Sequence, residues 1–263
     1  MSGFSLRADG AVVLITGGAS GIGRGVAEVF GEAGYRLVLA DFDVPAGEQT
    51  AADLRARGYE IELLLCDVAD ESQVAATVQA AAQRWQRLDV LVNNAGIVGR
   101  QTTIENLEQA DLDRVLGVDL KSVFFACKHA IPRMRERGGG SILNVASMTA
   151  ETGSAYYTAY GAAKAGVIAL TRGLARQIGR FNIRINCLSP GSIAGTGLMQ
   201  EHYDRHPEAR TREKLGLLKK IPVGRLGTPR DVALFALFLA SPLATHIHGA
   251  VLTIDGGESL GFQ

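Results

Sequence analysis

A tyrosine and a lysine stand four residues apart in the segment AYYTAYGAAK, at Tyr160 and Lys164. On a helix, this spacing places both side chains on one face. A free phenol loses its proton only at about pH 10, and a neighbouring cation stabilises the resulting phenolate. The pair therefore suits general acid–base chemistry, in which the phenol exchanges a proton with an alcohol or carbonyl oxygen. Tyr156 and Tyr157 lack a lysine at this spacing, so we expect them to pack or to line a pocket.

Ser147 follows the apolar run of residues 141–145, which predicts a strand that ends just before it. In open α/β sheets, the carboxyl ends of the strands form the ligand-binding edge. A hydroxyl there can hydrogen-bond a substrate oxygen and stabilise the charge that develops on it. The alternative is a serine that only caps a helix or closes a turn.

Residues 15–23 read ITGGASGIG, between an apolar run and a helical pattern. A helix N-terminus presents unpaired N–H groups and the positive end of the helix dipole, and so attracts phosphate. Gly17, Gly21 and Gly23 would permit a tight turn, close approach of a pyrophosphate and close helix–strand packing. We expect Ser20 and Ile22, in the same turn, to contact the same ligand.

An acid, Asp41, ends the next predicted strand. A carboxylate there can accept hydrogen bonds from adenosine ribose hydroxyls, and it repels a 2′-phosphate. Phe42 follows it, so no base stands beside the acid, and Arg24 is the one nearby candidate for holding that phosphate. We expect NAD(H) as the cofactor rather than NADP(H).

Short apolar runs alternate with segments of helical period along the chain. Nearly continuous apolar runs are typical of parallel strands that are covered on both faces, and the alternation indicates βαβ units. Strands are expected over residues 11–16, 36–40, 61–65, 90–93, 141–145, 183–187 and 250–254. Helices are expected over residues 22–33, 47–57, 71–86, 107–137, 156–179 and 231–239. We predict an α/β fold with a seven-stranded, doubly wound parallel sheet flanked by helices on both faces.

One long polar excursion interrupts this rhythm at about residues 192–225. Because it follows the carboxyl end of a strand, we expect a substrate lid or pocket wall, and a solvated surface insertion is the alternative. No repeat or linker divides the chain, so residues 1–263 are predicted to form one domain.

Composition excludes several other classes of protein. The 263 residues carry 27 Lys and Arg against 27 Asp and Glu, which argues against nucleic-acid binding. Three dispersed cysteines indicate reduced core thiols. The chain begins without an apolar leader, and no run reaches the ~20 residues that span a bilayer. We expect a cytoplasmic protein with no membrane partner.

Two histidines, His202 and His206, have the i, i+4 spacing of metal-binding helices. No HExxH motif accompanies them, so a solvated or substrate-facing helix is the preferred interpretation and no metal is expected.

The chain resembles the short-chain dehydrogenase/reductase family over essentially its whole length. The motifs that carry the resemblance come in the family's order: TGGASGIG at 16–23, Asp67-Val68, NNAG at 93–96, Ser147, YGAAK at 160–164 and Pro190-Gly191. The resemblance implies a Rossmann-type domain that transfers hydride between a nicotinamide and an alcohol or carbonyl. It also implies a homotetramer.

The same resemblance assigns further cofactor contacts. Asp67 and Val68 would flank the adenine. Lys164 would hold ribose hydroxyls. The residues expected to line the rest of the cofactor site are Phe42, Asn94, Ala95, Gly96, Tyr160, Pro190, Gly191, Ile193 and Thr196.

One position departs from the family's pattern. Asp119, in VLGVDLKSVFF, stands where the family usually has an asparagine that takes part in a proton relay to the lysine. A carboxylate beside Lys164 would favour the protonated lysine. We therefore expect an active enzyme with an altered relay.

The sequence predicts an NAD-dependent oxidoreductase that interconverts a secondary alcohol, sugar or polyol and its ketone. The alternatives are an NADPH-dependent 3-oxoacyl-thioester reductase and a non-catalytic nucleotide sensor. The residues expected to face the substrate are Met148, Thr152, Tyr157, Ser192, Met199 and His202.

Overall fold

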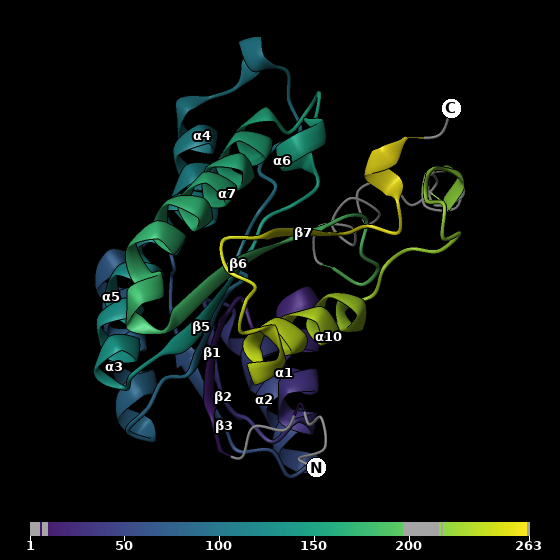
Figure 1. The fold of residues 1–263 in the computed structure, drawn as a ribbon. Coiled ribbons are helices and arrows are strands. Elements are labelled where there is room, and N and C mark those ends of the chain that lie inside the picture. The colour runs from purple at the N-terminus through teal and green to yellow at the C-terminus, as the bar shows by residue number, and fades with distance from the viewer. Residues whose placement is uncertain (1–5, 7–9, 197–215, 217, 262–263) are drawn as a thin grey trace.

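The computed structural model describes residues 6, 10–196, 216 and 218–261. Seven strands form one sheet in the order β3-β2-β1-β4-β5-β6-β7, and every neighbouring pair is parallel (Figure 1). The strands are β1 (Val12–Thr16), β2 (Arg36–Asp41), β3 (Ile61–Leu65), β4 (Val90–Asn93), β5 (Gly140–Val145), β6 (Ile183–Pro190) and β7 (Val251–Ile254). The predicted doubly wound parallel sheet is confirmed.

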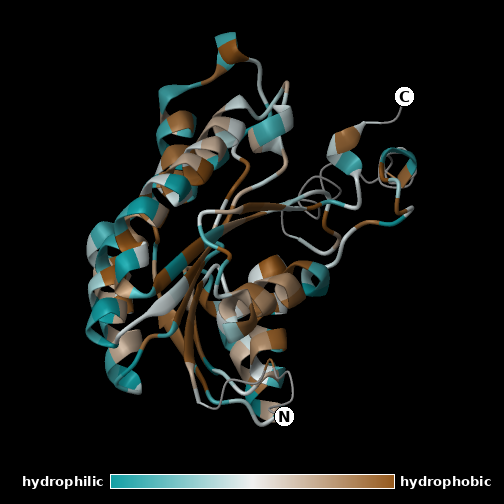
Figure 2. Cartoon of the chain, viewed as in Figure 1, coloured by the Kyte–Doolittle hydropathy of each residue, from teal (hydrophilic) through white to brown (hydrophobic). Residues whose placement is uncertain are grey.

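Helices cover both faces of the sheet (Figure 1). One face packs against α1 (Gly21–Glu32), α2 (Val44–Ala56) and α10 (Pro229–Ala240). The other packs against α3 (Glu71–Arg84), α5 (Ser122–Glu136) and α7 (Thr158–Ile178). Figure 2 shows apolar strands in the middle and hydrophilic residues on the outward sides of α3 and α5.

The central strands are buried because helices cover both of their faces. Every residue of β1 and of β4 is buried, as the continuous apolar runs predict. The parallel register brings the carboxyl ends of β1, β4, β5 and β6 to one edge of the sheet. Ser147 and the glycine-rich turn follow two of these strand ends, those of β5 and β1.

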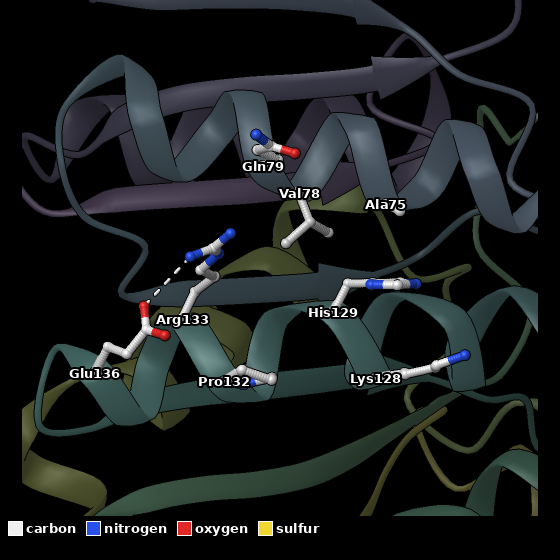
Figure 3. Close-up of a pocket in the computed structure, with 8 residues that line it drawn as sticks. All are labelled: Ala75, Val78, Gln79, Lys128, His129, Pro132, Arg133 and Glu136. Atoms are coloured by element: carbon white, nitrogen blue, oxygen red, sulfur yellow. Dashed lines mark hydrogen bonds and ion pairs between the residues drawn. The ribbon is translucent and has the colours of Figure 1, made fainter.

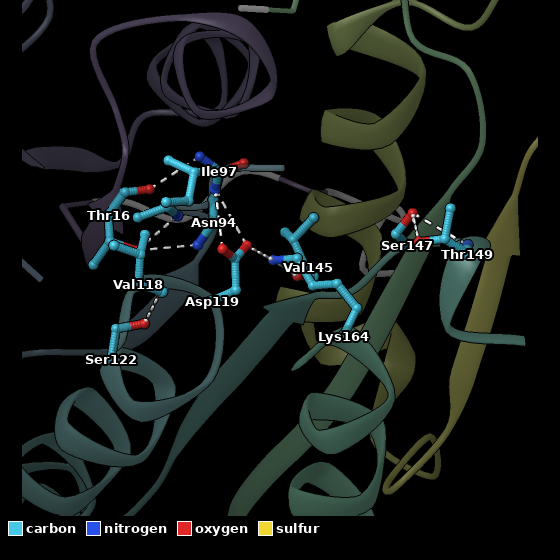
Figure 4. A network of polar contacts seen from close by, with 11 residues as sticks. Thr16, Asn94, Ile97, Val118, Asp119, Ser122, Val145, Ser147, Thr149 and Lys164 are labelled. Atoms are coloured by element: carbon cyan, nitrogen blue, oxygen red, sulfur yellow. Dashed lines mark hydrogen bonds and ion pairs between the residues drawn. The ribbon is translucent and has the colours of Figure 1, made fainter. Parts of the chain in front are cut away.

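The helix expected over residues 107–137 is interrupted. Its first part is α4 (Gln109–Leu116), and one π-helical turn, η2 (Gly117–Lys121), joins it to α5. Within this turn the Ser122 hydroxyl donates to the Val118 carbonyl (Figure 4). Such wide turns are rare and occur often at functional sites. The sequence pattern did not predict this one.

The excursion after β6 is closed at its base. Ile193 pairs with Gly227, and the Ala194 N–H donates to the Gly227 carbonyl at 2.8 Å. Two of the expected substrate residues, Met199 and His202, lie outside the described residues. In the described part of the chain, no helix is both long and apolar enough to cross a bilayer.

Candidate active site

Tyr160 and Lys164 lie in the first two turns of α7, both buried, with 8% and 3% of their surface exposed. The Lys164 Nζ lies 5.6 Å from the centre of the Tyr160 ring, as the i, i+4 spacing predicts. The same nitrogen donates to the Val145 carbonyl at 3.1 Å. This bond ties the lysine to the end of β5, the strand that leads to Ser147.

Asp119 places a carboxylate against this lysine (Figure 4). Its Oδ1 lies 3.1 Å from Lys164 Nζ, and the aspartate has no exposed surface. The Ile97 N–H donates to both carboxylate oxygens, at 3.3 and 3.1 Å. Gly96 makes room for the pair, because a Cβ there would come within 2.6 Å of Asp119 Oδ1.

The surroundings favour a charged lysine. Burial opposes the ammonium, but the Asp119 carboxylate and the nearby Tyr160 outweigh it and raise the pKa of Lys164. Burial also raises the pKa of Asp119, and the Lys164 charge and the Ile97 N–H work against this shift. The expected proximity of Asp119 and Lys164 is therefore present, and its electrostatic effect has the expected sign.

Ser147 follows β5 and begins the turn into the short helix α6 (Thr149–Thr152). Its Oγ accepts from the Thr149 hydroxyl at 3.0 Å and from the Thr149 N–H at 3.3 Å (Figure 4). The turn-closing role considered for this serine is thus present. The Ser147 O–H can still act as a donor to a ligand.

The glycine-rich turn is built as the sequence predicts. Gly17 and Gly21 have φ of +64° and +51°, the left-handed region that favours glycine. A Cβ on Gly23 would lie 2.0 Å from the Gly17 carbonyl oxygen. Ser20 is the exposed N-cap of α1, and its side chain makes no capping hydrogen bond. Ile22, in the first turn, is half-buried.

The turn is held by Asn94, which follows β4, and by Thr16, the last residue of β1, to which sequence reasoning gave no role. The Asn94 side-chain amide donates to the carbonyls of Thr16 and Gly17, both at 3.0 Å. The Thr16 hydroxyl accepts from the N–H groups of Asn94 and Ala95, at 3.0 and 3.2 Å. A Cβ on Gly17 would lie 2.8 Å from the Ala95 Cα, so β4 and the turn are in close contact.

Asp41 fixes the same turn from the other side. Its carboxylate accepts from the Ala19 N–H at 2.9 Å and from the Asp43 N–H at 3.1 Å. A carboxylate offers about four acceptor positions, so two remain for ribose hydroxyls. Phe42 beside it is 71% exposed.

Arg24, the one candidate for holding a 2′-phosphate, is already engaged. Its guanidinium contacts Glu28 at 3.3 Å and Asp53 at 2.9 Å. It also donates to the Thr50 hydroxyl at 3.4 Å. Two acids therefore compete with any phosphate for this arginine.

The loop after β3 carries the residues expected near an adenine. Asp67 is exposed, and its Oδ1 accepts from the Ala69 N–H at 2.9 Å. Val68 is buried in the core.

The chain segment that follows β6 passes close to the glycine-rich turn. A Cβ on Gly21 would lie 3.5 Å from the Thr196 Cα, while the Thr196 hydroxyl donates to the Ile193 carbonyl at 3.1 Å. The Gly191 N–H donates to the Ile254 carbonyl of β7. The structure thus brings Thr196, Ile193 and Gly191 to the same edge as the turn.

The four expected substrate residues that the structure describes lie on the chain segments that follow β5 and β6. Met148 is half-buried and its N–H donates to the Pro190 carbonyl at 3.0 Å. Thr152 is exposed and bonds the Met148 carbonyl at 3.1 Å. The Tyr157 hydroxyl contacts Gln101 at 3.4 Å. Ser192 bonds an acid, Glu258, which sequence reasoning missed.

A hollow of about 310 Å³ lies away from this edge, between α3 and α5 (Figure 3). Its lining is mostly polar and includes Lys128, His129, Arg133 and Glu136. None of the predicted site residues that the structure describes lines this hollow. Within the described residues, no cluster of three or more His, Cys, Asp or Glu side chains could hold a metal ion.

The chain is similar to known proteins over nearly its whole length. Residues 17–259 match the family model described as enoyl-(acyl carrier protein) reductase. The chain is 38% identical to the 3-oxoacyl-[acyl-carrier-protein] reductase of Chlamydia pneumoniae, over 94% of this chain and 96% of that protein. It is also 38% identical to the D-threitol dehydrogenase of Mycolicibacterium smegmatis, over 98% of this chain and 96% of that protein.

Solved structures give the same picture. The crystal structure of levodione reductase superposes with a TM-score of 0.91 at 35% identity. The match covers 98% of this chain and 100% of that one. A 7α-hydroxysteroid dehydrogenase complexed with NADH and 7-oxo glycochenodeoxycholic acid has a TM-score of 0.88 at 33% identity, covering 98% and 97% of the two chains.

The chain belongs to the short-chain dehydrogenase/reductase family. It is an oxidoreductase of a family that binds a nicotinamide cofactor and acts on small molecules.

Proposed function

We propose that this protein is an NAD(H)-dependent oxidoreductase that interconverts a secondary alcohol of the sugar or polyol type and its ketone. Residues 1–263 would form one domain, and Tyr160 would be the general acid/base. The observation that carries the proposal is the buried Lys164 ammonium, which lies 5.6 Å from the Tyr160 ring and is held by Asp119.

The residues around the glycine-rich turn fit a dinucleotide. The first turn of α1 leaves N–H groups without helical partners, as a pyrophosphate requires. Asp41 keeps free acceptor positions for the adenosine ribose, and its negative charge disfavours a 2′-phosphate. Because Arg24 is bound to Glu28 and Asp53, it does not offset that repulsion. This arrangement supports NAD(H) over NADP(H).

When bound, a nicotinamide supplies the hydride acceptor or donor for the substrate carbon. In alcohol oxidation, Tyr160 takes the hydroxyl proton, and in ketone reduction it returns that proton. Ser147 donates its O–H to the substrate oxygen and orients it. Lys164 stabilises the phenolate, and the Val145 carbonyl fixes the position of its ammonium.

Asp119 keeps Lys164 protonated during turnover. Because the carboxylate contacts the ammonium directly, Lys164 retains its proton and gives it up less readily to the Tyr160 phenolate. We therefore propose that the proton relay through Lys164 is weakened in this protein.

A 3-oxoacyl-thioester reductase that uses NADPH is the second candidate. The similarity to the Chlamydia reductase favours it, and the engaged Arg24 disfavours it. Both candidates share the same acid–base group, so the coenzyme and the substrate panel separate them.

The proposed function is tested by initial rates with NAD⁺ and NADP⁺ on a panel of polyols, sugars and hydroxy acids, and with NADH and NADPH on acetoacetyl-CoA. We expect turnover with NAD⁺ and a neutral polyol. Preferential reduction of acetoacetyl-CoA by NADPH would instead establish the second candidate. Tyr160→Phe serves as the control, because it should lose turnover and keep NADH binding, and a nucleotide sensor would show no turnover to lose.

We also propose a cytoplasmic homotetramer. Cys66, Cys127 and Cys187 are buried and unpaired, which suits a reducing compartment. Phe124 of α5 and Leu234 of α10 are exposed apolar side chains on helices that subunits could share. Light scattering after size exclusion tests the assembly.

A further inference from the structure

The strongest unexplained feature near the candidate site is an acid close to the C-terminus. Glu258 begins the short helix η5 (Glu258–Leu260), which follows β7. Its Oε2 accepts from the Ser192 N–H, and its Oε1 accepts from the Ser192 hydroxyl, both at 2.8 Å. The backbone N–H and the hydroxyl of Ser192 therefore hold the Glu258 carboxylate in a single orientation.

These contacts place Glu258 at the edge of the sheet where the candidate catalytic residues gather. Ser192 lies two residues after Pro190, whose carbonyl accepts from the N–H of Met148, the neighbour of Ser147. Gly191, between them, lies against the acid, because a Cβ there would come within 2.8 Å of Glu258 Oε2. Hydrogen bonds thus link Glu258 to the loop after β6, and the end of β6 to Met148, the neighbour of Ser147.

The Glu258 carboxylate has no ion-pair partner in the part of the chain that the structure describes. Among the described residues, no Lys, Arg or His nitrogen lies within 4 Å of the Glu258 carboxylate, whereas Asp119 is paired with Lys164. The two hydrogen bonds from Ser192 leave about two acceptor positions free on the carboxylate. Asp255, whose carboxylate accepts from the N–H groups of Gly257 and Ser259, adds a second negative charge nearby.

The proposed function requires a substrate oxygen beside Ser147 and Tyr160, so the rest of the substrate extends from that point. The loop after β6 is one of the chain segments that border this point. Glu258 gives this loop a negative charge that no described cation pairs with, and about two acceptor positions on its carboxylate remain free. Hydroxyl groups can donate to such acceptors, and carboxylates are repelled by the charge.

We propose that Glu258 is a specificity-determining residue that makes the enzyme favour neutral, hydroxyl-rich alcohols over anionic ones. This inference rests on the proposed function. Ser192 then acts by fixing the orientation of Glu258. The competing explanation is that Glu258 only fastens the C-terminal segment to the loop after β6.

The test compares two substrates of equal carbon number that carry the same secondary alcohol, one a neutral polyol and one a hydroxy acid. kcat/KM is measured for both with wild type and with Glu258→Gln, which keeps an acceptor for Ser192 and removes the charge. We expect the polyol-to-acid ratio of kcat/KM to fall about tenfold, mainly through a lower KM for the acid. The dissociation constant of NADH should not change.

Glu60→Gln is the matched control. Glu60 precedes β3 at the opposite edge of the sheet, where it pairs with Arg36 at 3.1 Å. Removing this negative charge should leave the ratio unchanged. Ser192→Ala is a second control, because it removes one hydrogen bond and retains the charge, so most of the discrimination should persist.

An unchanged ratio in a folded Glu258→Gln variant, or an equal loss for both substrates, would overturn the inference and leave Glu258 as a fastening residue. If the variant does not fold, the wild-type ratio is measured at rising ionic strength. An electrostatic origin requires the ratio to fall as the Debye length shortens, and a constant ratio would overturn it. Failure of the proposed function is distinct, because wild type would then oxidise neither substrate with NAD⁺.

Discussion

The carboxylate of Asp119 and the ammonium of Lys164 form a buried ion pair, with 3.1 Å between Oδ1 and Nζ. Neither side chain is appreciably exposed to solvent. The pair lies beside Tyr160, so the charge that would stabilise a phenolate is itself stabilised by a second acid. This relationship makes the electrostatics of the site depend on Asp119.

Replacing Asp119 by Asn should therefore change the pH dependence of turnover. Asp119 raises the pKa of Lys164, so its loss lets the lysine deprotonate at lower pH. We expect the alkaline limb of kcat/KM to move to lower pH, while the activity at neutral pH is kept. An alkaline limb at the same pH in both proteins would show that the carboxylate charge does not act on the site.

Replacing Lys164 by Met should destabilise the fold in a pH-dependent way. Leaving one partner of a buried pair without the other costs about 3–5 kcal/mol. Burial raises the pKa of Asp119 in the folded state above its unfolded value, so the folded state binds a proton more tightly. The loss of stability should be large at pH 8 and smaller on acidification.

Urea unfolding of the Lys164→Met variant at pH 5 and pH 8 measures this difference. The double variant with Asp119→Asn should recover part of the stability at pH 8, because no buried charge remains. Equal losses at both pH values, or no recovery in the double variant, would contradict an ionised Asp119.

Asp41→Asn should weaken NAD⁺ binding and its preference over NADP⁺. Hydrogen bonds to a charged group contribute about 1.5–3 kcal/mol, so the KM for NAD⁺ should rise about tenfold or more. Arg24→Ala is the comparison, because Arg24 is occupied by two acids and should contribute nothing to NADP⁺ use. A loss of NADP⁺ activity in Arg24→Ala would show that this arginine is available to a phosphate after all.

Gly23→Ala should abolish dinucleotide binding. The new Cβ would lie 2.0 Å from the Gly17 carbonyl oxygen, so the turn must shift. Gly173→Ala, on α7 with nothing within 4 Å of the new Cβ, should instead add about 0.5–1 kcal/mol of stability. NADH fluorescence titration and thermal melting of both variants provide the measurements, and retained NADH affinity in Gly23→Ala would refute the close packing.

Much of the fold could be predicted because the strands here are short and continuously apolar. The runs at 61–65 and 90–93 coincide with β3 and β4 residue for residue. The i, i+4 spacing likewise places Tyr160 and Lys164 on one face of α7, since that relation is local.

Contacts between distant segments could not be predicted in this way. The contact of Asp53 with Arg24 depends on how α1 and α2 pack. The bonds between Ser192 and Glu258 join positions 66 residues apart, and no periodicity marks either residue. Hydroxyls such as Thr16 resemble any strand residue until the neighbouring strand is in place.

The π-helical turn at Gly117–Lys121 has a consequence for the evolution and engineering of this enzyme. A residue advances about 100° around an α-helix, so deleting one residue from this turn would restore regular winding and rotate what precedes it by about that angle relative to α5. A chain shortened in this way could keep every side chain of the site and still lose the contact between Asp119 and Lys164. The position of Asp119 against Lys164 thus depends on the number of residues in this turn as well as on their identities.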